Sequence, residues 1–166
     1  MEHAVETRDD SVELCAAVRT LLAMKLVATV VVGATLLACS GQVEKVSETD
    51  VDGAQRATAQ ALATRVYDGC RSRSHQPLGE DEAIKEMRDA LTPAKLASTC
   101  TSIASQFGDY QSLDYAETWK PSSGSLRVYR FKGHFSRSTD TPEIRVVMDG
   151  SKLSGFWLKP WADTLR

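Results

Sequence analysis

The sequence predicts an α+β domain in which about three N-terminal helices pack on a four-stranded antiparallel meander. Apolar residues recur every three or four positions up to Gly108, the spacing of a helix, and at every second position after it, the spacing of a strand. Helices followed by a run of strands are typical of α+β domains with the helices on one sheet face. A length of 166 residues suits one domain, which we place at 54–166.

Three segments before Gly108 carry helix patterns. The first spans 52–73 and has a thin, alanine-rich apolar stripe. The second spans Glu80–Leu91, where three acids in the first turn suit the helix dipole. The third begins at Thr92-Pro93, an N-cap followed by proline at the first helical position, and ends at Gly108. The stripe expected on the first helix consists of Ala54, Ala57, Ala61, Leu62, Arg65, Val66 and Gly69.

The four strands are expected around 113–119, 126–135, 144–148 and 153–158. Pro121 to Gly124 separates the first two, and Asp149-Gly150 is a hairpin turn between the last two. In the first strand the alternation places Leu113, Tyr115 and Trp119 on one face, and the last strand is apolar on both faces. The expected sheet concentrates the aromatic residues Tyr115, Trp119, Tyr129, Phe131, Phe135, Phe156 and Trp157.

Ahead of the domain, Leu26–Ala38 is an apolar run without a charge. It is shorter than the roughly 20 residues that a membrane-spanning helix needs, and it suits the core of a secretory signal of about 7–15 residues. The sequence Leu36-Leu37-Ala38-Cys39 resembles the lipobox of bacterial lipoproteins. That resemblance implies cleavage before Cys39 and lipid on its thiol, which would anchor the protein in a membrane. The alternative is an uncleaved buried helix with a chance cysteine.

Residues 1–23 do not suit the start of a signal peptide, because they hold five acidic and two basic side chains. Met24-Lys25 offers a start of the proper charge. We therefore expect translation to begin at Met24, with 24–38 as the signal peptide; a long, atypical leader is the alternative. Residues 39–53 are polar and predict a tether. By the sorting rule of lipoproteins, Ser40 favours the outer membrane, with the domain in the periplasm.

The predicted domain also resembles the cone-shaped α+β domains of the nuclear transport factor 2-like superfamily and its cystatin-like relatives. The resemblance lies in helices that precede an antiparallel sheet and in the ending Val146–Pro160, a strand, a turn and a strand with glycine and aromatics. It implies a curved sheet that encloses a pocket, in a superfamily of isomerases, dehydratases and many binding proteins. Its isomerases use an aspartate base with hydroxyl donors, and no acid–tyrosine pair of this sequence matches that motif.

Catalytic and metal-binding patterns are missing from the sequence. His75 and His134 have no second ligand at metal spacing, and neither a serine-hydrolase elbow nor a phosphate-binding glycine loop occurs. We expect no catalytic residue, metal or cofactor. Were the protein a small isomerase-like enzyme, Asp114 would be the nearest candidate for an acid in the pocket.

Cys70 and Cys100 remain as a pair once Cys39 is lipidated, in a compartment where disulfides persist. Both lie near the inner face or the end of a predicted helix, so we expect a disulfide between them. Two free, buried thiols are the alternative.

The protein as a whole is therefore expected to be a membrane-anchored binding module. Trp119, Tyr129 and Trp157 are the expected ligand-binding residues, for an apolar ligand or an envelope protein. Basic residues crowd the middle strands and suit either a solvated sheet face or an acidic partner, while nucleic acid is not expected for an exported protein. A structural envelope protein with a filled core is the remaining alternative.

Overall fold

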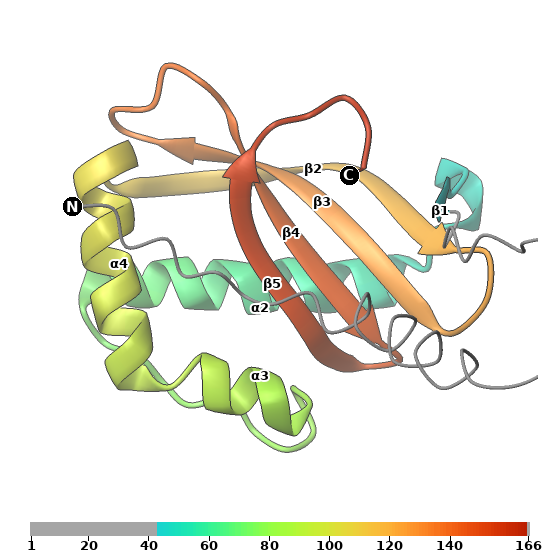
Figure 1. Cartoon of the computed structure of the whole chain (residues 1–166), viewed down its shortest axis with the longest axis horizontal. Coiled ribbons are helices and arrows are strands. Elements are labelled where there is room, and N and C mark those ends of the chain that lie inside the picture. Colours follow the sequence, from blue (N-terminus) through green and yellow to red (C-terminus); the bar gives the residue numbers. More distant parts are fainter. Residues whose placement is uncertain (1–42, 166) are drawn as a thin grey trace, which may run out of the picture. The chain divides into compact units, whose positions relative to one another are not determined.

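The computed structural model describes residues 43–165 and shows an α+β fold with a five-stranded antiparallel sheet in the order β1-β2-β3-β4-β5. Helix α2 lies across one face of the sheet, and α3 and α4 follow at its side (Figure 1). The residues expected to form the leader and the lipid site, up to Cys39, lie outside the described residues. The elements are β1 Val43–Lys45, the 3-10 helix η1 Glu48–Asp50, α2 Gly53–Ser72, α3 Lys85–Ala90, α4 Pro93–Phe107, β2 Tyr110–Pro121, β3 Leu126–Phe135, β4 Pro142–Asp149 and β5 Lys152–Pro160.

The α+β class agrees with the prediction, but the expected four strands after three N-terminal helices are corrected to five strands. The additional strand, β1, precedes the helices and pairs with the end of β2, with Val43 opposite Pro121 and Lys45 opposite Trp119. Together with η1 it occupies a segment that we expected to be tether. These three exposed residues, one valine and two charged side chains, are too short a run to carry a strand pattern of their own, so β1 exists only through its pairing with β2.

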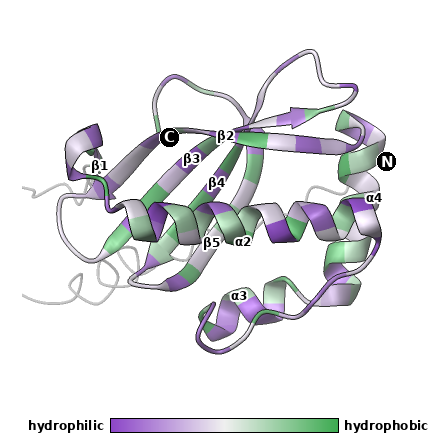
Figure 2. Ribbon diagram, turned by 180° about the vertical axis from the view of Figure 1, so that it is seen from behind, coloured by the Kyte–Doolittle hydropathy of each residue, from purple (hydrophilic) through white to green (hydrophobic). Residues whose placement is uncertain are grey.

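Helix α2 begins at Asp52, whose carboxylate accepts hydrogen bonds from the backbone of Ala54 and Gln55. Figure 2 shows α2 in front of the sheet, whose strands carry apolar residues behind it. The expected apolar stripe is correct at Leu62, Val66 and Gly69 and wrong at three alanines, Ala54, Ala57 and Ala61, which are exposed. Alanine occurs all round this helix, so the large side chains decide which face is buried. The buried residues are Ala59, Leu62, Ala63, Val66, Tyr67 and Gly69.

Helix α3 is shorter than expected, because it begins at Lys85 and the acidic residues before it form a turn. The Glu82 carboxylate there accepts hydrogen bonds from the backbone N–H of Gly79 and from Arg65 of α2. The backbone of this segment also reaches the edge of β5: Leu153 donates to Glu82, and Ile84 donates to Leu153. Glu82 therefore stabilises a connection between α2 and β5 instead of a first helical turn.

Helix α4 begins and ends as predicted, with Thr92 as N-cap, Pro93 in the first turn and Gly108 at the end with a φ of 84°. Cys100 on this helix forms a disulfide with Cys70 near the end of α2, and their Cα atoms lie 5.1 Å apart. The disulfide therefore joins the end of α2 covalently to the middle of α4.

We call the side of the sheet that faces α2 the inner face. The core fills the space between this face and α2. Tyr129, Phe131 and Ile144 of that face are at most 1% exposed. Tyr67 of α2 stacks on Tyr110, with ring centres 5.1 Å apart, and its ring meets Phe135 edge-on. Small residues on α2 let the helix lie close to the sheet, so the large sheet aromatics complete the packing.

Candidate functional site: the outer face of the sheet

We call the side of the sheet opposite α2 the outer face. It carries the polar residues and tryptophans of the strands that lie outside the core. Strand pairing places them in rows across the strands. The first row begins with Val43 of β1 and Pro121 of β2, and the next three follow along the strands. The second row consists of Lys45, Trp119, Val128, Val147 and Gly155; the third of Glu117, Arg130, Arg145 and Trp157; and the fourth of Asp114, Lys132, Glu143 and Lys159.

A β-bulge in β2 decides which residues of that strand reach the outer face. The pairing shifts between Tyr115, which lies opposite Phe131, and Glu117, which lies opposite Arg130. The extra residue reverses the alternation, so Tyr115 faces the core while Trp119 faces outward. The expectation that Leu113, Tyr115 and Trp119 share one face is therefore wrong for Trp119.

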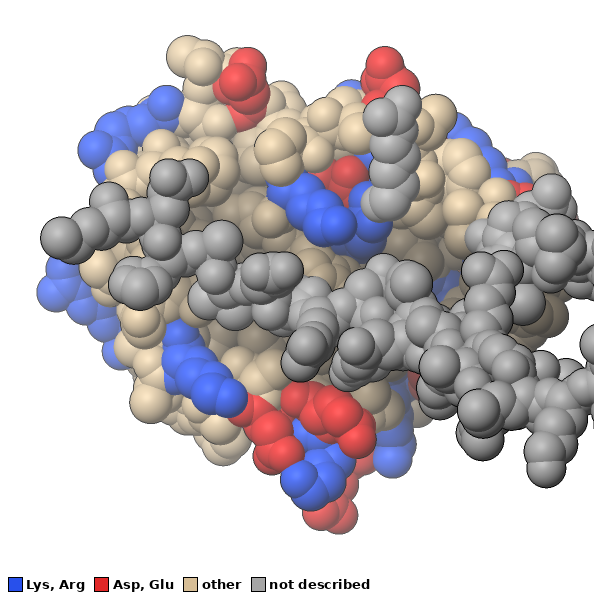
Figure 3. Space-filling model, in the orientation of Figure 1, with Lys and Arg blue, Asp and Glu red and all other residues tan. Residues whose placement is uncertain are grey.

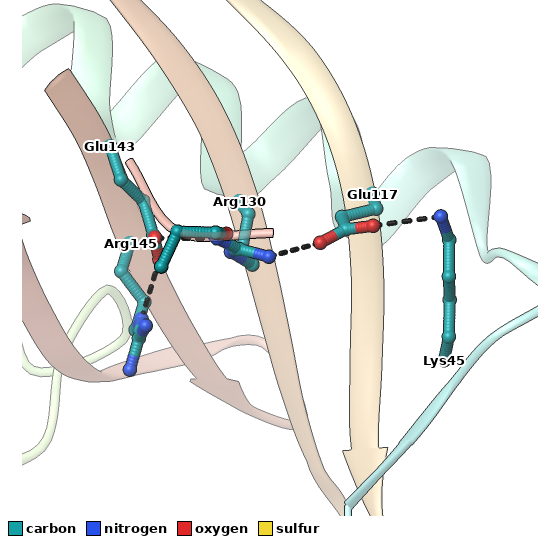
Figure 4. A network of polar contacts seen from close by, with 6 residues as sticks. Lys45, Glu117, Arg130, Glu143 and Arg145 are labelled. Carbon is teal, nitrogen blue, oxygen red and sulfur yellow. Dashed lines mark hydrogen bonds and ion pairs between the residues drawn. The ribbon is translucent and has the colours of Figure 1, made fainter. Parts of the chain in front are cut away.

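Arg130 is fully buried at the centre of the outer face and joins four charged side chains into one network (Figure 4). Its guanidinium pairs with Glu117 of β2 and, at 2.7 Å, with Glu143 of β4. Glu117 also pairs with Lys45 of β1, and Glu143 pairs with Arg145, each at 2.7 Å. The network links β1 to β4 by charge, in addition to the backbone hydrogen bonds.

The ion pairs hold the two carboxylates in their charged form. Burial by itself would raise the pKa of Glu143, but the hydrogen bonds from Arg130 and Arg145 outweigh it and keep this pKa below the ordinary value. For Glu117, burial is likewise outweighed, here by Lys45 and by the nearby charge of Arg130, so its pKa is also lowered. Both acids are therefore ionised at neutral pH.

The segment after β5 covers this network. The Trp161 ring lies over the Arg130 guanidinium, with the ring centre 4.3 Å from its carbon, and the ammonium of Lys132 is 5.2 Å from the same ring. The carbonyl oxygen of Ala162 accepts a further hydrogen bond from Arg130. Cation–π contact and hydrogen bonding together explain how an arginine on the face opposite α2 becomes fully buried.

Trp157 lies beside this covered region and is 41% exposed. Among residues 43–165, the other large exposed hydrophobic residues are Val43 and Leu126, and both are less exposed than Trp157. Its ring extends over Gly155 of the same strand, where an added Cβ would lie 2.3 Å from the ring carbon Cη2. Glycine at 155 thus leaves the space in which the indole lies against the sheet. The result is an exposed apolar surface on β5, just after the point where the pairing with β4 shifts by one residue.

Basic side chains surround acidic ones on this side of the molecule. In Figure 3, blue Lys and Arg side chains gather around a small red acidic area. Lys132 and Lys159 are exposed, whereas Glu117 and Glu143 are 10% and 1% exposed. On β3 and β5 of this face, the charges that a partner would meet are therefore positive.

The three expected ligand-binding residues do not line one pocket. Trp119 of β2 and Trp157 of β5 lie on the outer face with two strands between them, whereas Tyr129 lies on the inner face and is 1% exposed. The Tyr129 hydroxyl donates a 2.6 Å hydrogen bond to Gln55 of α2. The structure thus brings the two tryptophans onto one face and places Tyr129 in the core behind them.

Tyr129 nevertheless borders a pocket of about 250 Å³ near the start of α2. Asp52, Gln55 and Arg127 contribute polar groups to its lining. Burial raises the pKa of Tyr129 to about 12, so its hydroxyl stays protonated. Asp52 is committed to capping α2 and Gln55 to the hydroxyl of Tyr129, so the polar groups here serve the fold.

Asp114, the candidate acid of a pocket, lies instead on the outer face with its side chain 71% exposed. It pairs at 2.8 Å with His134, whose side chain is 41% exposed. His75 lies apart from this pair, beside Gly69 of α2. Within residues 43–165, no group of three His, Cys, Asp or Glu side chains is placed to hold a metal ion.

Trp161 and the two buried glutamates were not singled out by sequence reasoning. Glu143 and Arg145 stand two positions apart in β4, so the alternation does place them on one face with opposite charges. Nothing in the sequence near Trp161 indicates that the chain turns back over the sheet after Pro160.

Comparisons with protein families, with characterised proteins and with solved structures find no match to this chain. In the part of the chain that the structure describes, every helix is too short or too polar to cross a membrane.

Proposed function

We propose that the protein is a bacterial envelope lipoprotein, anchored by lipid on Cys39 and facing the periplasm from the outer membrane. The apolar run Leu26–Ala38 and the lipobox-like sequence that ends at Cys39 are two independent features that support this address. The disulfide between Cys70 and Cys100 suits an oxidising compartment.

The domain on this anchor acts as a non-catalytic binding module, and its partner is an acidic envelope protein with an apolar contact residue. The observation that carries this proposal is Trp157, a large exposed indole held flat on a strand. Tryptophans of this kind are enriched at the centres of protein interfaces. Exposed Lys132 and Lys159 supply a positive rim that would favour an acidic partner.

An isomerase-like role, which the resemblance to the nuclear transport factor 2-like superfamily would allow, finds less support. It would need an acid directed into an apolar pocket. The acids of the outer face are either paired with arginines or, like Asp114, exposed to solvent. Asp52, which lines the same pocket as Tyr129, caps a helix.

The binding face is tested by photo-cross-linking in the envelope. A photoreactive phenylalanine analogue placed at Trp157 should give a defined adduct, while the same group at Ala57, exposed on the far side of α2, should give none. Lys132→Glu with Lys159→Glu should weaken the adduct, because charge reversal opposes an acidic partner. Equal labelling at both positions, or an adduct that the charge reversal leaves unchanged, would contradict the proposal.

The anchor has its own test. Expressed in a Gram-negative host, the protein should partition into detergent, and Cys39→Ser should release it or leave it unprocessed. The mature protein should begin at Cys39 and carry the mass of the lipid. A fully soluble mature protein with an unmodified Cys39 would rule the anchor out.

A further inference from the structure

The start of β1 lies very close in sequence to Cys39. Only residues 40–42 separate the lipid site from Val43, so even a fully extended chain keeps Val43 within about 14 Å of Cys39. A polar tether of residues 39–53 would have allowed the domain to move freely. Because β1 pairs with β2, the connection between Cys39 and the sheet is only residues 40–42. One end of the sheet is therefore held near whatever surface receives the lipid.

That end of the sheet has a definite composition. Val43 lies opposite Pro121 on the outer face, and Leu126 follows across the β2–β3 turn. Val43 is 38% exposed and Leu126 is 39% exposed, and they are two of the three large exposed hydrophobic residues in the described range. The turn between Pro121 and Leu126 consists of serines and glycine. We call this group, Val43 and Pro121 to Leu126, the tether end.

The charges beside the tether end balance one another. Lys120 pairs with Glu44 at 3.0 Å, and Lys45 pairs with Glu117 at 2.7 Å. Asp149, opposite Leu126, accepts a hydrogen bond from Ser125. This end thus offers uncharged turn residues and two aliphatic side chains rather than a positive patch, so its contact with lipid would not depend on anionic headgroups.

We propose that the tether end rests against the bilayer, with Val43 and Leu126 in the headgroup region and the strands standing away from the membrane. The proposal rests on lipidation of Cys39, as proposed above. The short connection supplies proximity, and the exposed aliphatic side chains supply a surface that gains by leaving water. The β3–β4 loop, at the opposite end of β3, then points into the periplasm.

The test uses the full, lipidated protein in vesicles of phosphatidylcholine and phosphatidylethanolamine. A fluorophore is attached to a cysteine introduced by Leu126→Cys or Ser123→Cys at the tether end, or by Asp140→Cys in the β3–β4 loop as the matched control. Cys70 and Cys100 are joined and Cys39 carries lipid, so the introduced thiol is the reactive one in the mature chain. Lipids with a headgroup quencher should quench both tether-end positions several-fold more than Asp140→Cys.

A linker of about 15 Gly and Ser residues inserted after Gln42, which adds roughly 20 Å of reach, should reduce quenching at the tether end toward the control level. Equal quenching at both ends in protein that remains in the vesicles would overturn the orientation and leave the anchor intact. Shielding of the tether end from aqueous iodide without quenching by lipid would mean that protein covers it, and would also overturn the proposal. Protein that never enters the vesicles would instead contradict lipidation.

Discussion

The guanidinium carbon of Arg130 lies 4.3 Å from the centre of the Trp161 ring, although 31 positions separate the two residues in the sequence. Trp161 thereby covers a buried ion network on the side of the sheet opposite α2. A chain segment beyond the last strand thus completes the burial of a residue in the middle of the sheet.

Replacing Trp161 should destabilise the fold. Trp161→Ala removes the cation–π contact, worth about 0.5–2 kcal/mol, and lets water reach Arg130. Urea denaturation should show a lower free energy of unfolding, and Trp161→Phe should restore part of it. Trp157→Ala is the control, because its exposed ring should cost about 1 kcal/mol or less. Unchanged stability in Trp161→Ala would show that the segment after β5 does not hold the network.

Removing the charge of Glu143 should alter the pH dependence of stability. Its pKa is lowered from the ordinary 4.5 in the folded protein, so the ionised carboxylate stabilises the fold above that pH and the contribution is lost as pH falls below it. Glu143→Gln should cost about 3–5 kcal/mol at neutral pH, because Arg130 keeps a buried charge with one partner fewer. Between pH 5 and 2, roughly the range over which paired carboxylates titrate, the variant should lose less stability than the wild type.

Glu44→Gln is the control for that experiment. Glu44 pairs with Lys120 at the surface, where both side chains are well exposed, so its loss should change the free energy of unfolding by less than about 1 kcal/mol. A Glu143→Gln protein with the same acid sensitivity as the wild type would contradict the role assigned to the network.

The disulfide should contribute stability through the unfolded state. Cys70 and Cys100 enclose a loop of 30 residues, for which the chain-entropy relation gives about 3.6 kcal/mol. Cys70→Ser with Cys100→Ser should lower the free energy of unfolding by about that amount and make it insensitive to reductant. Mass spectrometry without reductant should find the two peptides cross-linked in the exported protein. Two thiols open to alkylation in the native protein would rule the disulfide out.

Several elements could be predicted from the sequence because their determinants are local. The pair Thr92-Pro93 begins α4, Gly108 ends it, and Asp149-Gly150 forms the last hairpin. Each works through hydrogen bonds or backbone preferences within a few residues, so the pattern and the structure coincide. The change of period at Gly108 likewise predicted the α+β class.

Other features depend on residues that are distant in the sequence. Strand β1 forms only against Trp119 to Pro121, and the bulge after Tyr115 turns Trp119 away from the face that strict alternation assigns to it. The length of α3 follows from the contact of Glu82 with Arg65. No local pattern contains these partners.

The sequence by itself thus determined the α+β class, the helix caps, the last hairpin and the alternation of β3 and β4, because neighbouring residues suffice for each. Tertiary structure alone decided which face each tryptophan occupies and how Arg130 is buried. The physical reason is that burying a charge requires several partners at once, and here they come from β2, β4 and the segment after β5. Only the folded chain brings these groups within hydrogen-bonding distance.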